Sequence, residues 1–176
     1  SALPRYRGPA PIVRALLDGA AETGVTTLWV TENVDAGDII LQRRVPILDD
    51  DTDGSLSARL AREGAELLME TISLVEQGRA PRHPQNDAEA TWAPPLKKKD
   101  LELDWTWPSR RIANLVRAAS PSPGCHTYHR GNRLKICRAV ALEADMSKPL
   151  PQGRDRHGGP SDLANEAPPG AWTALH

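Results

Sequence analysis

One carboxylate lies in a turn between two apolar segments, where it could carry acid–base chemistry. Asp35 belongs to the turn VDAGD at residues 34–38, which joins the β-branched residues 25–31 to the apolar residues 39–45. Side-chain carboxylates can move protons in catalysis, and carboxylates with perturbed pKa values gather at active sites. Aspartate is also a common turn former, because its side chain bonds to nearby backbone. The sequence alone therefore leaves Asp35 as a catalytic group or a turn residue, and favours a turn or strand-start role for Asp38.

Positive charges gather in a later stretch of the chain. Three consecutive lysines precede a predicted helix that carries three arginines: Lys97, Lys98, Lys99, Arg110, Arg111 and Arg117. Arg110 and Arg117 are seven residues apart, so they lie on one helical face. Clustered cations on a chain of net charge −1 are what binding to a phosphate backbone requires. A solvated linker would carry the same residues, and charge pattern alone favours that interpretation.

Two further groups of residues have more than one interpretation. Arg5 and Arg7 could bind an anion through bidentate contacts or belong to a solvated loop. Two cysteines and two histidines provide donor types that zinc accepts: Cys125, His126, His129 and Cys137. Their spacing is not that of paired zinc knuckles, and neighbouring residues of a strand point to opposite faces. We therefore expect two free thiols and no metal here.

The elements that must position these groups follow from periodicity and end signals. We predict three helices, over residues 11–17, 52–78 and 109–119. We predict strands over 25–31 and 39–45, and a hairpin over 125–142 whose second strand runs from 134 to 142. Thr52 or Ser55 could cap the long helix. Residues 79–95 contain four prolines and no periodicity, which predicts a connector.

Length and composition limit the classes of protein. The chain has 176 residues, enough for one domain or for parts of two. No apolar run approaches the roughly 20 residues of a membrane helix. Two cysteines without a signal sequence favour a reducing compartment. Residues 147–169 are polar and rich in proline and glycine, so we predict a long loop or a disordered tail there.

Four stretches and two shorter segments, in this order, are together specific. They read SALPRYRGPAPI at 1–12, TGVTTLWVTENVDAGDIILQ at 23–42, DTDGSLSARLAREGAELL at 51–68 and ATWAPPLKKKDLELDW at 90–105, followed by RAASPSPG at 117–124 and RLKICRA at 133–139. The set resembles methionyl-tRNA formyltransferases from Ser1 to about Leu142. Any one piece is weakly specific, and the resemblance rests on their order and spacing.

The resemblance implies a fold and a division of the chain. The fold class is α/β: the second half of a Rossmann-like formyltransferase domain, then an incomplete OB-like β-barrel domain. The implied boundaries are 1–90 for the C-terminal half of the catalytic domain, 91–103 for a basic linker, and 104–176 for the truncated second domain. We expect the chain to be a fragment that lacks the N-terminal part and the end of the C-terminal domain.

The resemblance also implies a reaction, the transfer of a formyl group from 10-formyltetrahydrofolate to the amino group of initiator methionyl-tRNA. Such a site must stabilise a tetrahedral oxyanion and move a proton from the amine to the leaving folate nitrogen. The family uses an Asp together with the Asn and His of an Asn-x-His-x-Ser-Leu-Leu-Pro motif. The first residues of the chain, SALP, match the end of that motif with Ala2 in place of Leu. The Asn and His would precede Ser1, so we expect the chain as given to be inactive.

By resemblance, Asp35 is the catalytic aspartate. The implied folate-binding residues are Ser1, Ala2, Leu3, Pro4 and Val34. The implied tRNA-binding residues are Lys97, Lys98, Lys99, Arg110 and Arg117. We expect a monomer of the bacterial cytoplasm, or of an organelle in a eukaryote, that binds reduced folate and tRNA and no membrane. The alternatives are a sugar-nucleotide formyltransferase, a formyl-folate hydrolase, or a non-catalytic fragment that binds folate or RNA.

Overall fold

The computed structural model describes residues 1–142 of the chain, which contain three α-helices, four strands and two short 3₁₀ turns. In chain order they are α1 (Pro11–Leu17), β1 (Glu22–Leu28), β2 (Ile39–Pro46), α2 (Asp53–Glu76), η1 (Asp87–Glu89), η2 (Lys98–Leu101), α3 (Ser109–Ala118), β3 (Cys125–His129) and β4 (Asn132–Ile136). The predicted disordered segment 147–169 lies outside the described residues. No helix in the described part is long and apolar enough to cross a membrane.

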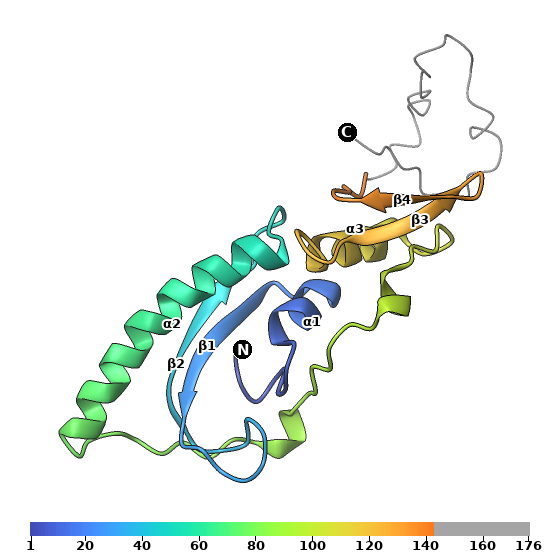
Figure 1. Cartoon of the computed structure of the whole chain (residues 1–176). Helices are drawn as coiled ribbons and strands as arrows, with labels where there is room; N and C mark the ends of the chain where they lie inside the picture. The colour runs from blue at the N-terminus through green and yellow to red at the C-terminus, as the bar shows by residue number, and fades with distance from the viewer. Residues whose placement is uncertain (143–176) are drawn as a thin grey trace.

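The first sheet is an antiparallel pair, β1 and β2, with α2 lying along one face (Figure 1). Alternation along each strand decides which side chains meet the helix. The Thr27 hydroxyl lies 2.8 Å from that of Thr71 on α2. Arg43, the neighbour of Val25 across the sheet, binds three glutamates of α2: Glu63, Glu66 and Glu70. The helix is thus fixed to this face by polar bonds at its middle and by apolar packing nearer its start.

The other face of the same sheet holds the beginning of the chain. Thr26 and Gln42 are cross-strand partners that point away from α2. The Thr26 hydroxyl donates to the Ser1 carbonyl at 2.7 Å, and the Gln42 amide donates to the Leu3 carbonyl at 2.8 Å. The sheet therefore lies between α2 and residues 1–4.

The long helix starts where the sequence predicts and buries only one side. Thr52 is its N-cap, and Thr52 and Ser55 exchange the two hydrogen bonds of a capping box. The helix buries four residues against the rest of the chain: Leu56, Leu60, Leu67 and Thr71. The apolar residues Leu68, Met69, Ile72 and Val75 are 43–67% exposed, because the two-stranded sheet covers a single side of the helix.

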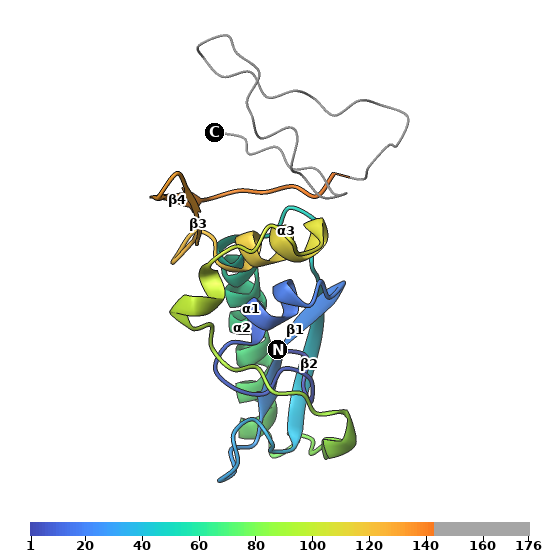
Figure 2. The ribbon, with the colours of Figure 1, turned by 90° about the vertical axis from the view of Figure 1, so that its right-hand side faces the viewer.

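Helix α3 joins the two parts of the described chain (Figure 2). Ala118 packs with Leu16 and Leu56 in one apolar cluster, while Ile112 and Leu115 belong to a second cluster that includes Cys125. Polar bonds reinforce the junction, since the Asn114 amide donates to the Leu17 carbonyl at the end of α1 at 3.3 Å. The structure therefore packs α3 against α1 as well as against the later hairpin.

The second sheet is a short hairpin, and here part of our prediction is wrong. Cys125 pairs with Ile136, and β4 ends at Ile136 rather than continuing to Leu142. Because β3 begins at Cys125, β4 has no strand partner beyond Ile136 among the described residues. Both sheets of the described part are open pairs of strands, and they support an α/β fold without closing a barrel.

Candidate functional site

Asp35 occupies the turn that leaves β1 and returns to β2. Its φ is +53°, and its carboxylate oxygen Oδ2 accepts the backbone N–H of Gly8 at 2.8 Å. The turn closes through a bond from the Trp29 N–H to the Asp38 carbonyl at 2.9 Å. Gly37 permits this closure, because a Cβ there would lie 1.7 Å from the Trp29 carbonyl oxygen. The turn thus presents a half-buried carboxylate in one fixed orientation.

The structure brings Asp35 close to the start of the chain. Burial lowers the pKa of the Ser1 amino group, and the nearby Asp35 carboxylate acts in the opposite direction. Leu3 is buried, whereas the Val34 side chain beside Asp35 is 59% exposed. Of the residues that we expected to bind folate, Ser1 has its amino group near the Asp35 carboxylate, and Val34 precedes Asp35 in the chain with its side chain open. The Ser1 and Leu3 carbonyls are held by the side chains of Thr26 and Gln42.

Asp38 lies three residues from Asp35 in a different environment. Its carboxylate contacts Arg82 at 3.4 Å, and Arg82 also lies over the Trp29 ring at 4.4 Å. These contacts suit the turn and strand-start role that we predicted for it.

The two early arginines differ from each other. The Arg7 side chain is 12% exposed and binds Gln85 and Asp87, so it is enclosed by the protein. Arg5 is exposed and lies over the Tyr6 ring at 5.4 Å. Neither the solvated-loop nor the anion-binding interpretation describes Arg7, which is part of an internal network.

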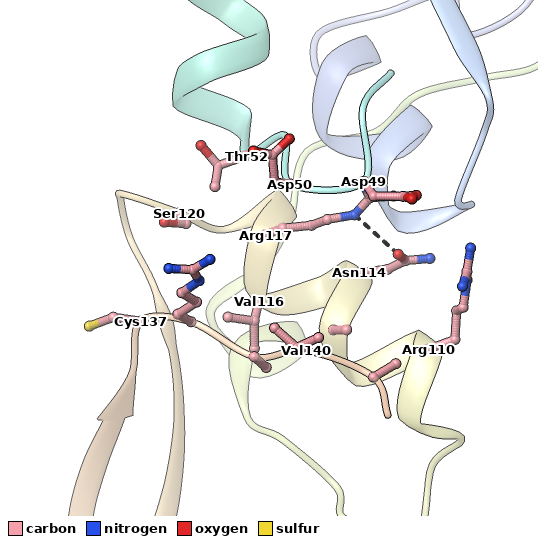
Figure 3. Close-up of a pocket in the computed structure, with 14 residues that line it drawn as sticks. Asp49, Asp50, Thr52, Arg110, Asn114, Val116, Arg117, Ser120, Cys137 and Val140 are labelled. Atoms are coloured by element: carbon pink, nitrogen blue, oxygen red, sulfur yellow. Dashed lines mark hydrogen bonds between the residues drawn. The ribbon is translucent and has the colours of Figure 1, made fainter. Parts of the chain in front are cut away.

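Arg110 and Arg117 line a hollow of ≈ 650 Å³ between α3, the start of α2 and the residues after β4 (Figure 3). Arg117 is partly committed to the protein, since Nε donates to Asn114 Oδ1 at 3.1 Å and Nη1 to the Leu48 carbonyl at 3.2 Å. Burial lowers the pKa of Arg117, while Asp49 acts to raise it. The hollow therefore combines arginines with nearby acidic residues.

Lys97, Lys98 and Lys99 do not line the hollow that contains Arg110 and Arg117. Lys97 and Lys99 line a separate hollow of ≈ 700 Å³, together with Trp107 and Arg111. The Arg111 guanidinium lies over the Trp107 ring at 4.1 Å. Lys98 lines neither hollow. Five of the six clustered cations thus divide between two hollows rather than forming one surface.

The two cysteines near the hairpin differ in burial. Cys125 is fully buried, its thiol reaches the Leu115 carbonyl at 3.5 Å, and burial raises its pKa to about 11. Cys137 is exposed. Among residues 1–142, no three side chains of the His, Cys, Asp and Glu types are grouped to hold a metal ion.

Comparisons with known proteins place the chain in a family. Residues 1–72 match the formyl transferase family, and residues 95–173 match its C-terminal domain. A methionyl-tRNA formyltransferase from Moorella thermoacetica is 51% identical over 136 residues, covering 77% of this chain and 44% of the relative. Another from Symbiobacterium thermophilum is 50% identical over 142 residues, covering 81% and 44%.

The chain belongs to the methionyl-tRNA formyltransferase family. It spans about half the length of the curated relatives that it matches.

Solved structures of other proteins are similar in fold to this chain. An N-formyltransferase from Helicobacter canadensis has a TM-score of 0.68 at 23% identity, covering 81% of this chain and 52% of that one. HypX from Aquifex aeolicus, solved with tetrahydrofolic acid, has a TM-score of 0.66 at 25% identity, covering 78% and 24%.

Reasoning from the sequence missed two residues beside the candidate methionyl-tRNA formyltransferase site. Gly8 supplies the N–H that holds the Asp35 carboxylate, and Gln85 donates to the Asp35 carbonyl. Gln85 lies in the connector, where no periodicity distinguishes one polar residue from another. The glycine offered a weak signal, since glycine often occupies places where the backbone must approach closely.

Proposed function

We propose that this chain forms part of an enzyme that transfers a formyl group from 10-formyltetrahydrofolate to the amino group of initiator methionyl-tRNA, for translation initiation. One observation carries the proposal, the 51% identity to a methionyl-tRNA formyltransferase over 77% of the chain. The position of the Asp35 carboxylate near Ser1 supports it. Because the curated relatives are bacterial, we assign the reaction to the bacterial cytoplasm.

We assign the folate donor to Ser1, Ala2, Leu3, Pro4 and Val34. The carbonyls of Ser1 and Leu3 are held by Thr26 and Gln42, which gives the segment a fixed shape before any ligand arrives. The exposed Val34 side chain adds apolar surface beside the carboxylate. The likeness to HypX, solved with tetrahydrofolic acid, supports a folate-derived donor. We assign no metal to the reaction.

The chemistry is an acyl transfer that one carboxylate can assist. The amine nitrogen attacks the formyl carbon, an oxyanion forms, and the carbon–nitrogen bond to folate breaks as the folate nitrogen takes a proton. Oδ2 of Asp35 is held by Gly8, and in the described chain Oδ1 accepts no hydrogen bond. Asp35 can therefore orient a base or relay the proton through Oδ1. The 176 residues contain no Asn-x-His, so the chain alone should lack those two groups.

We assign the tRNA acceptor to Lys97, Lys98, Lys99, Arg110 and Arg117. Charge separation along the chain supports the two arginines, because residues 105–142 contain seven Lys or Arg and no Asp or Glu. The match of residues 95–173 to the C-terminal domain of the family supports an OB-like second domain over 104–176. We propose that the protein acts as a monomer.

A chimera tests the proposal. The N-terminal part of the Moorella relative is joined ahead of Ser1, and formylation of methionyl-tRNA by 10-formyltetrahydrofolate is measured in single turnovers. We expect transfer by the chimera and none by the 176-residue chain. An amino-sugar nucleotide is offered as a second acceptor. A folded chimera that formylates only the sugar, or hydrolyses the donor without transfer, would contradict the proposal.

A further inference from the structure

The Asp35 turn has a conformation that its neighbours must hold. A φ of +53° is left-handed, and residues other than glycine adopt it rarely, aspartate less rarely than most. Such a conformation persists when the surrounding structure fixes it. The groups that bond to this turn therefore decide where its carboxylate points.

Gln85 supplies two of those bonds. Its Nε2 donates to the Asp35 carbonyl at 2.8 Å and to the Gly37 carbonyl at 2.7 Å. A primary amide carries two N–H groups, so both bonds can form at once. The Gln85 side chain, 50 residues after Asp35, thus bonds to the turn at two points.

Arg7 fixes the orientation of that amide. Gln85 Oε1 accepts from Arg7 Nη2 at 2.9 Å and from Nε at 3.2 Å. A guanidinium can only donate, so the amide oxygen must face Arg7 and the nitrogen must face the two carbonyls. Arg7 is itself fixed by Asp87 at 2.8 Å.

The same short segment also holds the other end of Asp35. Gly8 follows Arg7 and donates its N–H to Asp35 Oδ2 at 2.8 Å. The Arg7 backbone is bonded to the connector, through its N–H to the Thr91 carbonyl at 2.8 Å and through its carbonyl to the Ala93 N–H at 2.7 Å. The carboxylate of Asp35 is therefore bonded to this segment directly through Gly8, and its backbone is linked to the same segment through Gln85 and Arg7.

We infer that Gln85, oriented by Arg7, is a positioning residue that sets the direction of the Asp35 carboxylate. The inference rests on the proposed catalytic role of Asp35. Gln85 acts through its bonds to the Asp35 and Gly37 carbonyls. Because a displacement of about 1 Å can slow a reaction roughly 10²-fold, removing the two donated bonds should lower kcat by about 10–100-fold. KM for folate and tRNA should change by less than about threefold, because the lost interaction acts on the chemical step.

Two substitutions in the chimera distinguish the role of the Gln85 amide nitrogen from that of the whole polar side chain. Gln85→Glu keeps the size and the bond to Arg7, but places an oxygen against the two carbonyls. Gln85→Met keeps the length and removes all of the bonds. Asn86→Ala is the matched control, because within residues 1–142 the Asn86 side chain bonds to Ala88 and Glu89 of the connector and not to the Asp35 turn.

The deciding measurement is a double-mutant cycle with Asp35→Asn. If Gln85 acts through Asp35, adding Gln85→Glu to Asp35→Asn should change kcat by less than about twofold, because coupled residues are not additive. A general loss of structure would lower kcat equally in both backgrounds and would overturn the inference. A near-normal kcat for Gln85→Glu would overturn it as well. If the unsubstituted chimera fails to formylate methionyl-tRNA, the proposed function itself is wrong.

Hydrogen exchange of the 176-residue chain gives a second, independent readout. Peptides that cover residues 28–38 and Gly8 should exchange faster in Gln85→Glu than in Asn86→Ala. Unchanged exchange in Gln85→Glu would show that the turn does not depend on this side chain, and the inference would fail.

Discussion

Gly8 donates its backbone N–H to Oδ2 of Asp35 at 2.8 Å, across 27 residues of sequence. The bond constrains both the Asp35 carboxylate and the backbone of Gly8. It holds one carboxylate oxygen while leaving the other without a hydrogen bond in the described chain, and it requires the backbone of residue 8 to approach the turn closely. Gly8 has a φ of +109°, a conformation that other residues rarely adopt.

Asp35→Asn should separate catalysis from turn formation. Asparagine keeps the volume, keeps an oxygen that can accept from Gly8, and is itself a good turn former. In the chimera we expect the single-turnover rate of formyl transfer to fall by about 10²–10⁴-fold, the usual scale of a general acid–base contribution. Folate binding, measured alongside, should change little.

Asp38→Asn is the internal control for that experiment. Asp38 contacts Arg82 and lies outside the Gly8 bond, so its loss should leave the rate nearly unchanged. A larger loss at Asp38 than at Asp35 would remove Asp35 from the catalytic assignment.

Gly8→Ala should destabilise the chain and misplace the carboxylate. A Cβ at Gly8 would lie 3.0 Å from the Trp92 ring, in a backbone conformation that alanine avoids. We expect the free energy of unfolding, measured in urea, to fall by about 2–4 kcal/mol, since strain and overpacking each cost roughly 1–3 kcal/mol. Gly78→Ala is the control, because its φ is +64° and nothing lies within 4 Å of its added Cβ. An equal loss in both variants would show that the Trp92 contact is irrelevant.

Local signals predicted the elements well. The bounds of α1 match the prediction, and Thr52 and Ser55 do begin the long helix, because both features depend on residues within one turn of each other. Strand β1 starts earlier and ends sooner than predicted, with an irregularity between Thr27 and Leu28. That irregularity comes from pairing with β2, which single-strand periodicity does not report.

The arrangement around Asp35 could be predicted only in part. The resemblance placed Asp35 and residues 1–4 in one site, and the structure has the Ser1 amino group near the Asp35 carboxylate. The folate-binding role of residues 1–4 stays a prediction. The contact between Gln85 and the Asp35 turn joins positions 50 residues apart, and a proline-rich connector carries no pattern that points to it. Likewise, the charge pattern grouped Lys97 with Arg110, whereas the structure places them on different hollows because α3 separates their surfaces.

Lys97 and Lys99 should contribute to the salt dependence of tRNA binding. Lys97→Gln with Lys99→Gln removes two exposed charges, and we expect weaker tRNA binding by the chimera. The slope of log K against log salt should become shallower by about 1–2, since each phosphate contact contributes about 0.9. Arg62→Gln with Arg79→Gln removes two charges from α2 and its end as the matched control. The same change of slope in both pairs would indicate a general charge effect rather than a site.

The two thiols should differ in reactivity. The thiolate is the reactive form of cysteine, and burial raises the Cys125 pKa to about 11. A thiol reagent at pH 8 should therefore label the exposed Cys137 quickly and Cys125 only after unfolding. Cys137→Ser should abolish the fast phase. A fast phase that persists in this variant would contradict the buried position of Cys125.

Asp51 should make the free energy of unfolding depend on pH in the acid range. Unlike its exposed neighbours Asp49 and Asp50, Asp51 is buried. Its carboxylate accepts from the Leu48 N–H, Ser55 and Arg59. Burial alone would raise the pKa of Asp51, yet these donors hold it below its usual value.

A carboxyl whose pKa is lower in the folded state stabilises the fold above its unfolded pKa of about 3.9 and loses that contribution as the pH falls through the folded value. Asp51→Asn should therefore lower the free energy of unfolding at pH 7 by about 1.5–3 kcal/mol, the scale of hydrogen bonds to a charged group. The difference from the unsubstituted chain should shrink below about pH 4. Asp50→Asn, at an exposed neighbour, should show neither effect. Urea unfolding at pH 7, 5 and 3 would decide the matter, and a difference that grows toward low pH would contradict the assignment.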